Sequence, residues 1–289
     1  MNEYCSYEDL DEYQTLEVDE GGTTGDVRLL RGFCTTASRM WDGSTRRRFY
    51  PRSETRYYDH PDNATRLKVD DDLLEVVTLT TQNGEEEVSN DDYYLMCGTS
   101  YNLMPYDRLV MKTDGDMPVL LYSDRLQKAN ALTGIWGYHE DWADAWQSSN
   151  DAVVNDPLTA AATTLTVAGV EGKDIYGMAP RFTVQMLLRV EDEYLYVTGK
   201  SAAASTLAVR RGVNGTTAAA HAAASVIYIY QPMEDVVHAV KRLAAWLYAQ
   251  RSTPFSEQMS SVEIGGTIII PKSAPADVQA MAAMYRRRD

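Results

Sequence analysis

The fold is decided where the hydrophobic period of the chain changes, in the stretch MWDGSTRRRFYPRSETRYYD, residues 40–59. Before it, in residues 26–42, apolar side chains recur three and four positions apart, which predicts an amphipathic helix. Gly43 favours a helix C-terminus at that point. From Phe49 onward the period is two, and we expect alternation to send one of Phe49 and Tyr50 inward. The stretch therefore predicts the passage from a helix into a sheet.

The region from Phe49 to Tyr138 predicts an antiparallel sheet, because its segments are short, rich in Val, Tyr, Thr and Leu, and separated by turn residues. Asn83-Gly84 predicts a hairpin, since these residues accept the positive φ of a type I′ turn. The run Asp70 to Asp72 is expected to form a turn that launches the next strand. We expect strands in residues 54–60, 65–69, 73–81, 85–89, 91–96, 108–112 and 119–123.

Beyond the sheet region, residues 147–163 are small and polar and predict a domain boundary. The four or five short strands that follow predict a small all-β module of the sandwich or barrel kind. The helical period then returns in one long helix and in a last helix from Pro275, with an extended arm between them. The predicted fold is α+β, and its domains are residues 1–150, an inserted β module at 151–230, and residues 231–289. A short acidic helix behind Ser6 is also expected.

The composition limits the function. A net charge of −15 and a pI near 4.7 argue against broad adhesion to nucleic-acid phosphates. The N-terminus has no basic start or apolar core, and no window approaches 18 apolar residues, so we expect neither a signal peptide nor a membrane span. Three cysteines, Cys5, Cys34 and Cys97, have no metal-ligand spacing and are expected to be reduced thiols. We expect a soluble intracellular product, or one released by lysis.

Little in the sequence predicts catalysis. The histidines His60, His139, His221 and His238 share no ligand spacing, and no hydrolase or phosphate-loop motif is present. The run Asp70 to Asp72 admits a second interpretation, a metal-dependent hydrolase, but metal loops use spaced ligands rather than consecutive ones. We therefore expect no enzyme, no catalytic or metal residue and no cofactor.

The order of several segments points to a family. A helix ending in ASRMWDGSTRRRFYP is followed by ETRYYD, LKVDDDLLEVVTLTTQNGEEEVSNDDYYLM and LTGIWGY, and later by PMEDVVHAVKRLAAWLYAQR and a Pro-led helix ending in MYRRR. This succession, across most of residues 25–146 and 231–289, resembles the head-to-tail connector proteins of tailed bacteriophages, also called adaptors or head-completion proteins. The resemblance implies a helical adaptor core combined with the antiparallel sheet.

The resemblance also implies a structural role in the virion neck, after assembly in the host cytoplasm. Such adaptors form a twelvefold ring under the portal protein, extend the DNA channel and contact a stopper or tail-completion protein. Genomic DNA would pass without sequence-specific contact, and no membrane is involved. The C-terminal segment would dock on the portal. The expected portal or subunit interface comprises Arg46, Arg47, Arg48, Ile268, Ile269, Ile270, Met281, Met284, Tyr285, Arg286, Arg287 and Arg288, and the expected channel-lining acids are Glu85, Glu86 and Glu87.

The inserted module carries a second resemblance. Its RG-x-x-GT-x-A-x-x-H stretch, from Arg211 to His221, is similar to a small module that recurs in phage virion proteins. This module supports an alternative function, a binding or decoration protein on the tail or capsid. Its tyrosines at 194, 196, 228 and 230 suit a binding face, although alternation favours packing for them.

The arginine run Arg46 to Arg48 has three interpretations. It follows a helix C-terminus, where cations are stabilised by exposed carbonyl groups, so we favour helix capping together with salt bridges to a subunit or the portal. Contact with DNA and simple solvation are the alternatives. The C-terminal run Arg286 to Arg288 likewise suits either a helix terminus or docking on an acidic partner.

Overall fold

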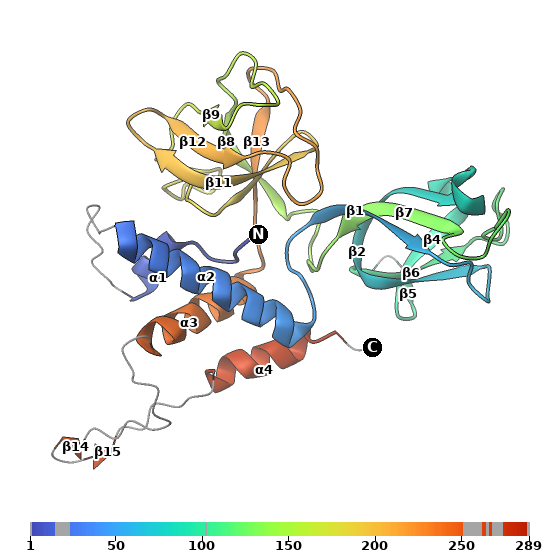
Figure 1. The fold of residues 1–289 in the computed structure, drawn as a ribbon, viewed down its shortest axis with the longest axis horizontal. Coiled ribbons are helices and arrows are strands. Elements are labelled where there is room, and N and C mark those ends of the chain that lie inside the picture. The colour runs from blue at the N-terminus through green and yellow to red at the C-terminus, as the bar shows by residue number, and fades with distance from the viewer. Residues whose placement is uncertain are drawn as a thin grey trace.

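The computed structural model describes residues 2–14, 24–101, 103–250, 262–263, 266–267 and 274–287. The chain is α+β and mostly β: in the described residues, four α-helices accompany two large antiparallel sheets (Figure 1). The predicted fold class is confirmed at this level. The helices lie together, one sheet extends from them on one side, and the second sheet forms a separate β module above them in the view of Figure 1.

The helices are α1 (Tyr7–Gln14), α2 (Thr24–Thr45), α3 (Glu234–Gln250) and α4 (Ala276–Tyr285), and α2 contacts the other three. The expected cap of α1 is present, since Ser6 Oγ accepts a hydrogen bond from Asp9 N at 3.0 Å and Ser6 N donates to Asp9 Oδ2 at 2.8 Å. Helices from both ends of the sequence therefore build one core. The buried face of α3 consists of Val236, Ala239, Val240, Leu243 and Ala244.

Helix α2 ends near Gly43, as the sequence predicted. It continues two residues further, to Thr45, and Arg46 takes the left-handed conformation, with φ of 55°, that ends it. The hydroxyl of Thr45 donates to the Trp41 carbonyl at 2.9 Å, one turn back along the helix. The expectation that only one of Phe49 and Tyr50 turns inward was also wrong, because both are buried.

The first sheet has the strand order β1–β7–β2–β6–β4–β5, with β3 paired to β2. Leu73, Leu79, Leu109, Leu132 and Trp136 are buried in its core. Its elements are β1 (Arg52–Tyr58), β2 (Arg66–Thr81), the 3₁₀ turn η1 (Gln82–Gly84), β3 (Glu86–Val88), the 3₁₀ turn η2 (Asn90–Asp92), β4 (Tyr93–Cys97), β5 (Ser100–Tyr101), β6 (Tyr106–Met111) and β7 (Asn130–Trp136).

The predicted hairpin is confirmed: Gln82, Asn83 and Gly84 all have positive φ, and β3 pairs with β2 beyond them. Two other expectations were wrong. The aspartates at 70–72 do not form a turn but lie inside β2, where the pairing with β6 is irregular between Lys68 and Leu73. Residues 119–123 are a loop and not a strand, fixed to the end of β2 by bonds between Thr81 and Leu121.

The β module contains β8 (Trp146–Ala152), β9 (Thr164–Thr166), β10 (Leu187–Val190), β11 (Glu193–Ser201), β12 (Thr206–Arg210) and β13 (Val226–Tyr230), in the order β8–β13–β10–β11–β12–β9. Val154 N donates to Thr166 O at 2.9 Å and so joins the two ends of this order, as in a barrel. The module begins earlier than predicted, because the polar segment from Trp146 pairs with β13 instead of forming a linker. Ser149 is buried in β8, and its hydroxyl accepts a hydrogen bond from Asp151 N at 3.2 Å. This polar side chain therefore has a hydrogen-bond partner within its own strand.

The β module is fastened to the helices by its own core residues. Tyr194, Tyr230 and Leu187 belong to the same buried cluster as α2 and α3. Tyr230 Oη donates to the Phe49 carbonyl at 2.7 Å, directly after the arginine run.

A short hairpin of β14 (Val262–Glu263) and β15 (Gly266–Thr267) precedes α4. Within the described parts of the chain, no helix has the length and hydropathy needed to cross a bilayer.

Candidate functional site

The two arginine runs, separated by more than 230 positions in the sequence, lie side by side in the structure. Arg46, Arg47 and Arg48 follow α2, and Arg287 follows α4 with its backbone N–H bonded to the Thr45 carbonyl at 2.9 Å. Both runs border a hollow of about 760 Å³. We call it the arginine hollow. Its charged lining is Arg39, Arg46, Arg47, Arg48, Arg52, Arg56, Arg287, Asp42, Asp70 and Asp71.

Arg47 is a structural residue that joins the helices to the first sheet. Its Nη1 lies 2.8 Å from Asp72 Oδ1, and its guanidinium lies over the Tyr138 ring at 4.3 Å from the centroid. Both side chains of this ion pair are largely buried, with exposed fractions of 17% and 8%. Removing one partner of such a pair leaves a buried charge without compensation. Arg47 is therefore committed within its own chain.

Strand β1 supplies two more arginines to the same network. Arg52 contacts Glu54 at 2.6 Å and Asp71 at 3.2 Å, while Arg56 contacts Glu54, Asp70 and Asp71 at 2.9–3.0 Å. Arg56 also stacks on Trp136, 4.0 Å from the ring centroid. The aspartate run of β2 is thus a row of arginine partners, and its carboxylates face guanidinium groups.

The C-terminal segment completes this network. Arg287 Nη1 donates to the Asp70 carbonyl at 2.6 Å and lies 3.4 Å from Asp71 Oδ1. The end of α4 is therefore fixed to β2 as well as to the end of α2. This contact joins three distant parts of the sequence at one surface.

Burial changes the pKa of two aspartates in this region. It raises the pKa of both Asp42 and Asp72 to about 6, although Arg39 and Arg47 offset part of the effect. Seven guanidinium groups and three carboxylates line the hollow itself, so its field is positive in a chain of net charge −15. Such a local reversal of sign favours an acidic partner at this face.

The residues predicted as an interface divide into two groups. Arg46, Arg48 and Arg286 are exposed, and Met284 is 82% exposed. Tyr285, by contrast, packs against Trp41, Phe49 and Tyr138, and its hydroxyl donates to Asp235. Met281 packs partly buried against the helical core. Ile268, Ile269, Ile270 and Arg288 lie outside the described residues.

The predicted channel acids lie elsewhere. Glu85, Glu86 and Glu87 are all exposed and lie in the hairpin between β2 and β3. The same end of β2 pairs with the start of β7. Asp72 lies near the middle of β2, where the pairing with β7 ends, and its carbonyl accepts from Gly137 N at 2.9 Å. The structure therefore does not bring these acids to the arginine hollow; they lie at the opposite end of the β2–β7 pairing from Asp72.

The module motif from Arg211 to His221 surrounds one buried carboxylate. Glu193, 1% exposed, accepts hydrogen bonds from Arg211 at 2.6 and 2.7 Å and lies 2.8 Å from His221 Nε2. The loop held in this way carries Asn214, whose carbonyl accepts from Ser53 N of β1 at 2.8 Å. The motif therefore fixes the module to the first sheet. The sequence analysis gave the motif only as a resemblance and missed Glu193, because no spacing rule links this residue to the motif.

The module tyrosines do not form the binding face considered above. Tyr194, Tyr196 and Tyr230 are buried, and only Tyr228, under the Arg189 guanidinium, is partly exposed. The packing interpretation is correct for the three buried rings.

Comparisons of the chain with protein-family models, with curated proteins and with solved structures found no match. The functional argument is therefore made from the site itself. Within the described residues, no three His, Cys, Asp or Glu side chains gather in a set suited to a metal ion.

Proposed function

We propose that this chain is a structural protein of a bacteriophage neck, an adaptor that forms a ring under the portal and joins the head to a stopper or tail protein. The observation that carries this proposal is the convergence of two arginine runs at the ends of α2 and α4, on one surface of an acidic chain. The protein acts by binding and not by turnover. A helical core built from both ends of the sequence supports this proposal.

The arrangement suggests how docking works. The inward arginines, Arg47, Arg52 and Arg56, fix the sheet to the helices, so the outward groups are held on a rigid base. Arg46, Arg48, Arg286 and Met284 are presented to a partner, either the portal or a neighbouring copy. Charged contacts of this kind set orientation and association rate more than affinity.

The remaining surface suits passage of DNA. A net charge of −15 keeps phosphate from adhering to the walls of a channel, and the exposed Glu85, Glu86 and Glu87 are proposed to line it. Ile268 to Ile270 and Arg288 are proposed to extend the portal contact.

The test uses virions assembled with variants of this chain. Arg48→Glu combined with Arg286→Glu reverses two exposed charges and should leave DNA-filled heads without tails. The control, Arg125→Glu, reverses one exposed charge in the loop between β6 and β7 and should give normal tailed particles. Mass spectrometry of separated heads and tails should place the chain with the heads, at one copy per portal subunit.

Normal tailed particles from the double variant would overturn the docking assignment. Recovery of the chain in the tail fraction, or a ratio far from one, would overturn the adaptor function and favour the second candidate, a tail or capsid decoration protein. That candidate is supported by one observation: a loop of the module exposes Ile175, Tyr176 and Met178 by half or more.

A further inference from the structure

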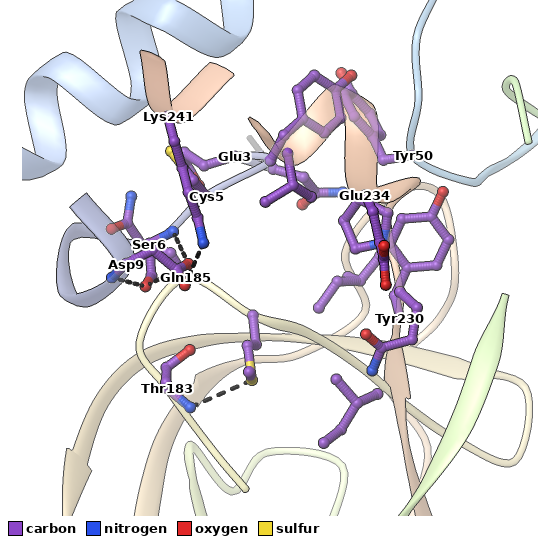
Figure 2. Close-up of a pocket in the computed structure, with 18 of the residues that line it drawn as sticks. Glu3, Cys5, Ser6, Asp9, Tyr50, Thr183, Gln185, Tyr230, Glu234 and Lys241 are labelled. Atoms are coloured by element: carbon purple, nitrogen blue, oxygen red, sulfur yellow. Dashed lines mark hydrogen bonds and ion pairs between the residues drawn. The ribbon is translucent and has the colours of Figure 1, made fainter. Parts of the chain in front are cut away.

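A second site lies away from the arginine hollow, where the N-terminal segment, α3 and the module meet. Figure 2 shows this cavity, which measures about 570 Å³ and includes no arginine in its lining. Its walls include Met178 and Met186 from the module and Val237 from α3. The volume lies within the range of sites that hold small ligands or peptide side chains.

The side-chain amide of Asn2 is a hydrogen-bonding group without a partner in this cavity. Its side chain is 3% exposed, lines the cavity, and has no partner for either Nδ2 or Oδ1 within the described residues. A buried polar group without a partner costs about 1–3 kcal/mol. The amide offers a donor and an acceptor side by side, which matches the N–H and C=O of one residue in an extended segment, because these two groups point to the same side.

A rigid apolar loop borders the same cavity. Asp174 Oδ1 accepts from the backbone N–H groups of Tyr176 and Met178, both at 2.9 Å, and Arg181 N donates to the Gly172 carbonyl at 2.9 Å. The loop is thereby fixed while Tyr176 and Met178 remain 66% and 69% exposed. Since Met178 also lines the cavity, apolar surface continues from the loop into it.

The charged residues that line this cavity favour a ligand with a positively charged group. Lys241 and Asp9 lie 3.1 Å apart and neutralise each other. Glu234, in the first turn of α3, is exposed and lies across the cavity from Asp9 in Figure 2. Its carboxylate forms no hydrogen bond or ion pair with the described residues. A positive side chain would compensate it.

We propose that this cavity binds an extended segment of a partner protein that carries an aliphatic residue followed by Lys or Arg. The Asn2 amide pairs with the N–H and C=O of one residue of the segment, the aliphatic side chain packs against Met178 and Met186, and the cation reaches Glu234. This proposal is independent of the adaptor function and needs only the isolated chain for its test.

The experiment is a titration of the full chain, labelled with ¹³C at its methionine methyl groups and followed by NMR. The probe is the peptide N-acetyl-Gly-Ile-Lys-Gly-amide, and its charge-reversed counterpart contains Glu in place of Lys. The Lys peptide should shift the methyl signals of Met178 and Met186 in a saturable manner. Met111, buried in the first sheet, serves as the internal reference and should not move. The Glu peptide should bind about tenfold more weakly.

Three variants separate the contributions. Glu234→Gln, an exposed change, should abolish the preference for the Lys peptide, and Asn2→Ala should weaken both peptides about tenfold through loss of its hydrogen bonds. Glu87→Gln, at the far end of the first sheet, should change nothing. Absence of saturable shifts at Met178 and Met186, or equal binding of both peptides to the unaltered chain, would overturn the proposal. Because Glu234 is exposed, its variant decides the charge argument even where the Asn2 variant is unstable.

Discussion

Replacing Glu193 by Gln should destabilise the chain strongly, because this one carboxylate organises the docking loop of the module. Besides Arg211 and His221, the backbone N–H groups of Gly212 and Ala219 donate to it at 2.9 and 3.0 Å. Burial acts to raise the pKa of Glu193, but Arg211 and these donors outweigh it and lower the pKa to about 2. The carboxylate is therefore ionised at neutral pH and paired on all sides.

The Glu193→Gln variant keeps the shape but leaves Arg211 buried without its counter-charge. Breaking a buried pair in this way costs about 3–5 kcal/mol, a large fraction of the stability of a typical domain. Denaturation with guanidinium chloride at pH 7 measures this loss. Glu191→Gln is the matched control, since Glu191 contacts the other nitrogen of His221 at 2.9 Å but is exposed, and we expect only a small change. Equal losses in the two variants would refute the assignment of Glu193 as the organising residue.

Three other predictions concern the contacts that join the helices, the first sheet and the module. Since burial raises the pKa of Asp72 to about 6, the folded chain holds this proton more tightly than the unfolded one. As pH falls from 6 to 4, the unaltered chain should therefore gain about 2 kcal/mol of stability relative to Asp72→Asn, measured by urea titrations at both pH values. Gly215→Ala places a Cβ 1.9 Å from a carbonyl oxygen of β1 and should speed proteolysis of the module, whereas Gly169→Ala enters open space and should not. Tyr230→Phe removes the hydrogen bond to the Phe49 carbonyl and should cost about 1–2 kcal/mol by chemical denaturation.

The sequence predicted the elements whose signals are local. The apolar stripe of α3, the serine cap of α1 and the positive φ at Asn83-Gly84 all depend on residues within a few positions of each other. Periodicity and turn chemistry detect such features without knowledge of the rest of the chain. The same logic failed for β8, because its polar residues resemble a linker until β13 pairs with them.

The arginine–aspartate network was not predictable in this way. A run of three aspartates suggests a turn or a metal site when only its neighbours are considered. Besides Arg52 and Arg56 of β1, its partners are Arg47, in the loop after α2, and Arg287, which is 216 positions from Asp71. Only the three-dimensional pairing of α2, α4 and β2 shows that these charges compensate each other. Long-range ion pairs carry no period and no spacing, so a single sequence does not reveal them.

The network also changes how charge reversals in the arginine run should be interpreted. Arg47 and Arg48 are adjacent in sequence, yet Arg47 is 17% exposed and paired with Asp72, while Arg48 is exposed. Arg47→Glu would place two carboxylates at a buried contact, so its phenotype would report folding and not docking. Arg48→Glu leaves that contact intact and changes only the surface offered to a partner. A loss of tails therefore supports the docking surface only when it comes from Arg48 or Arg286 in a chain that is folded as stably as the original.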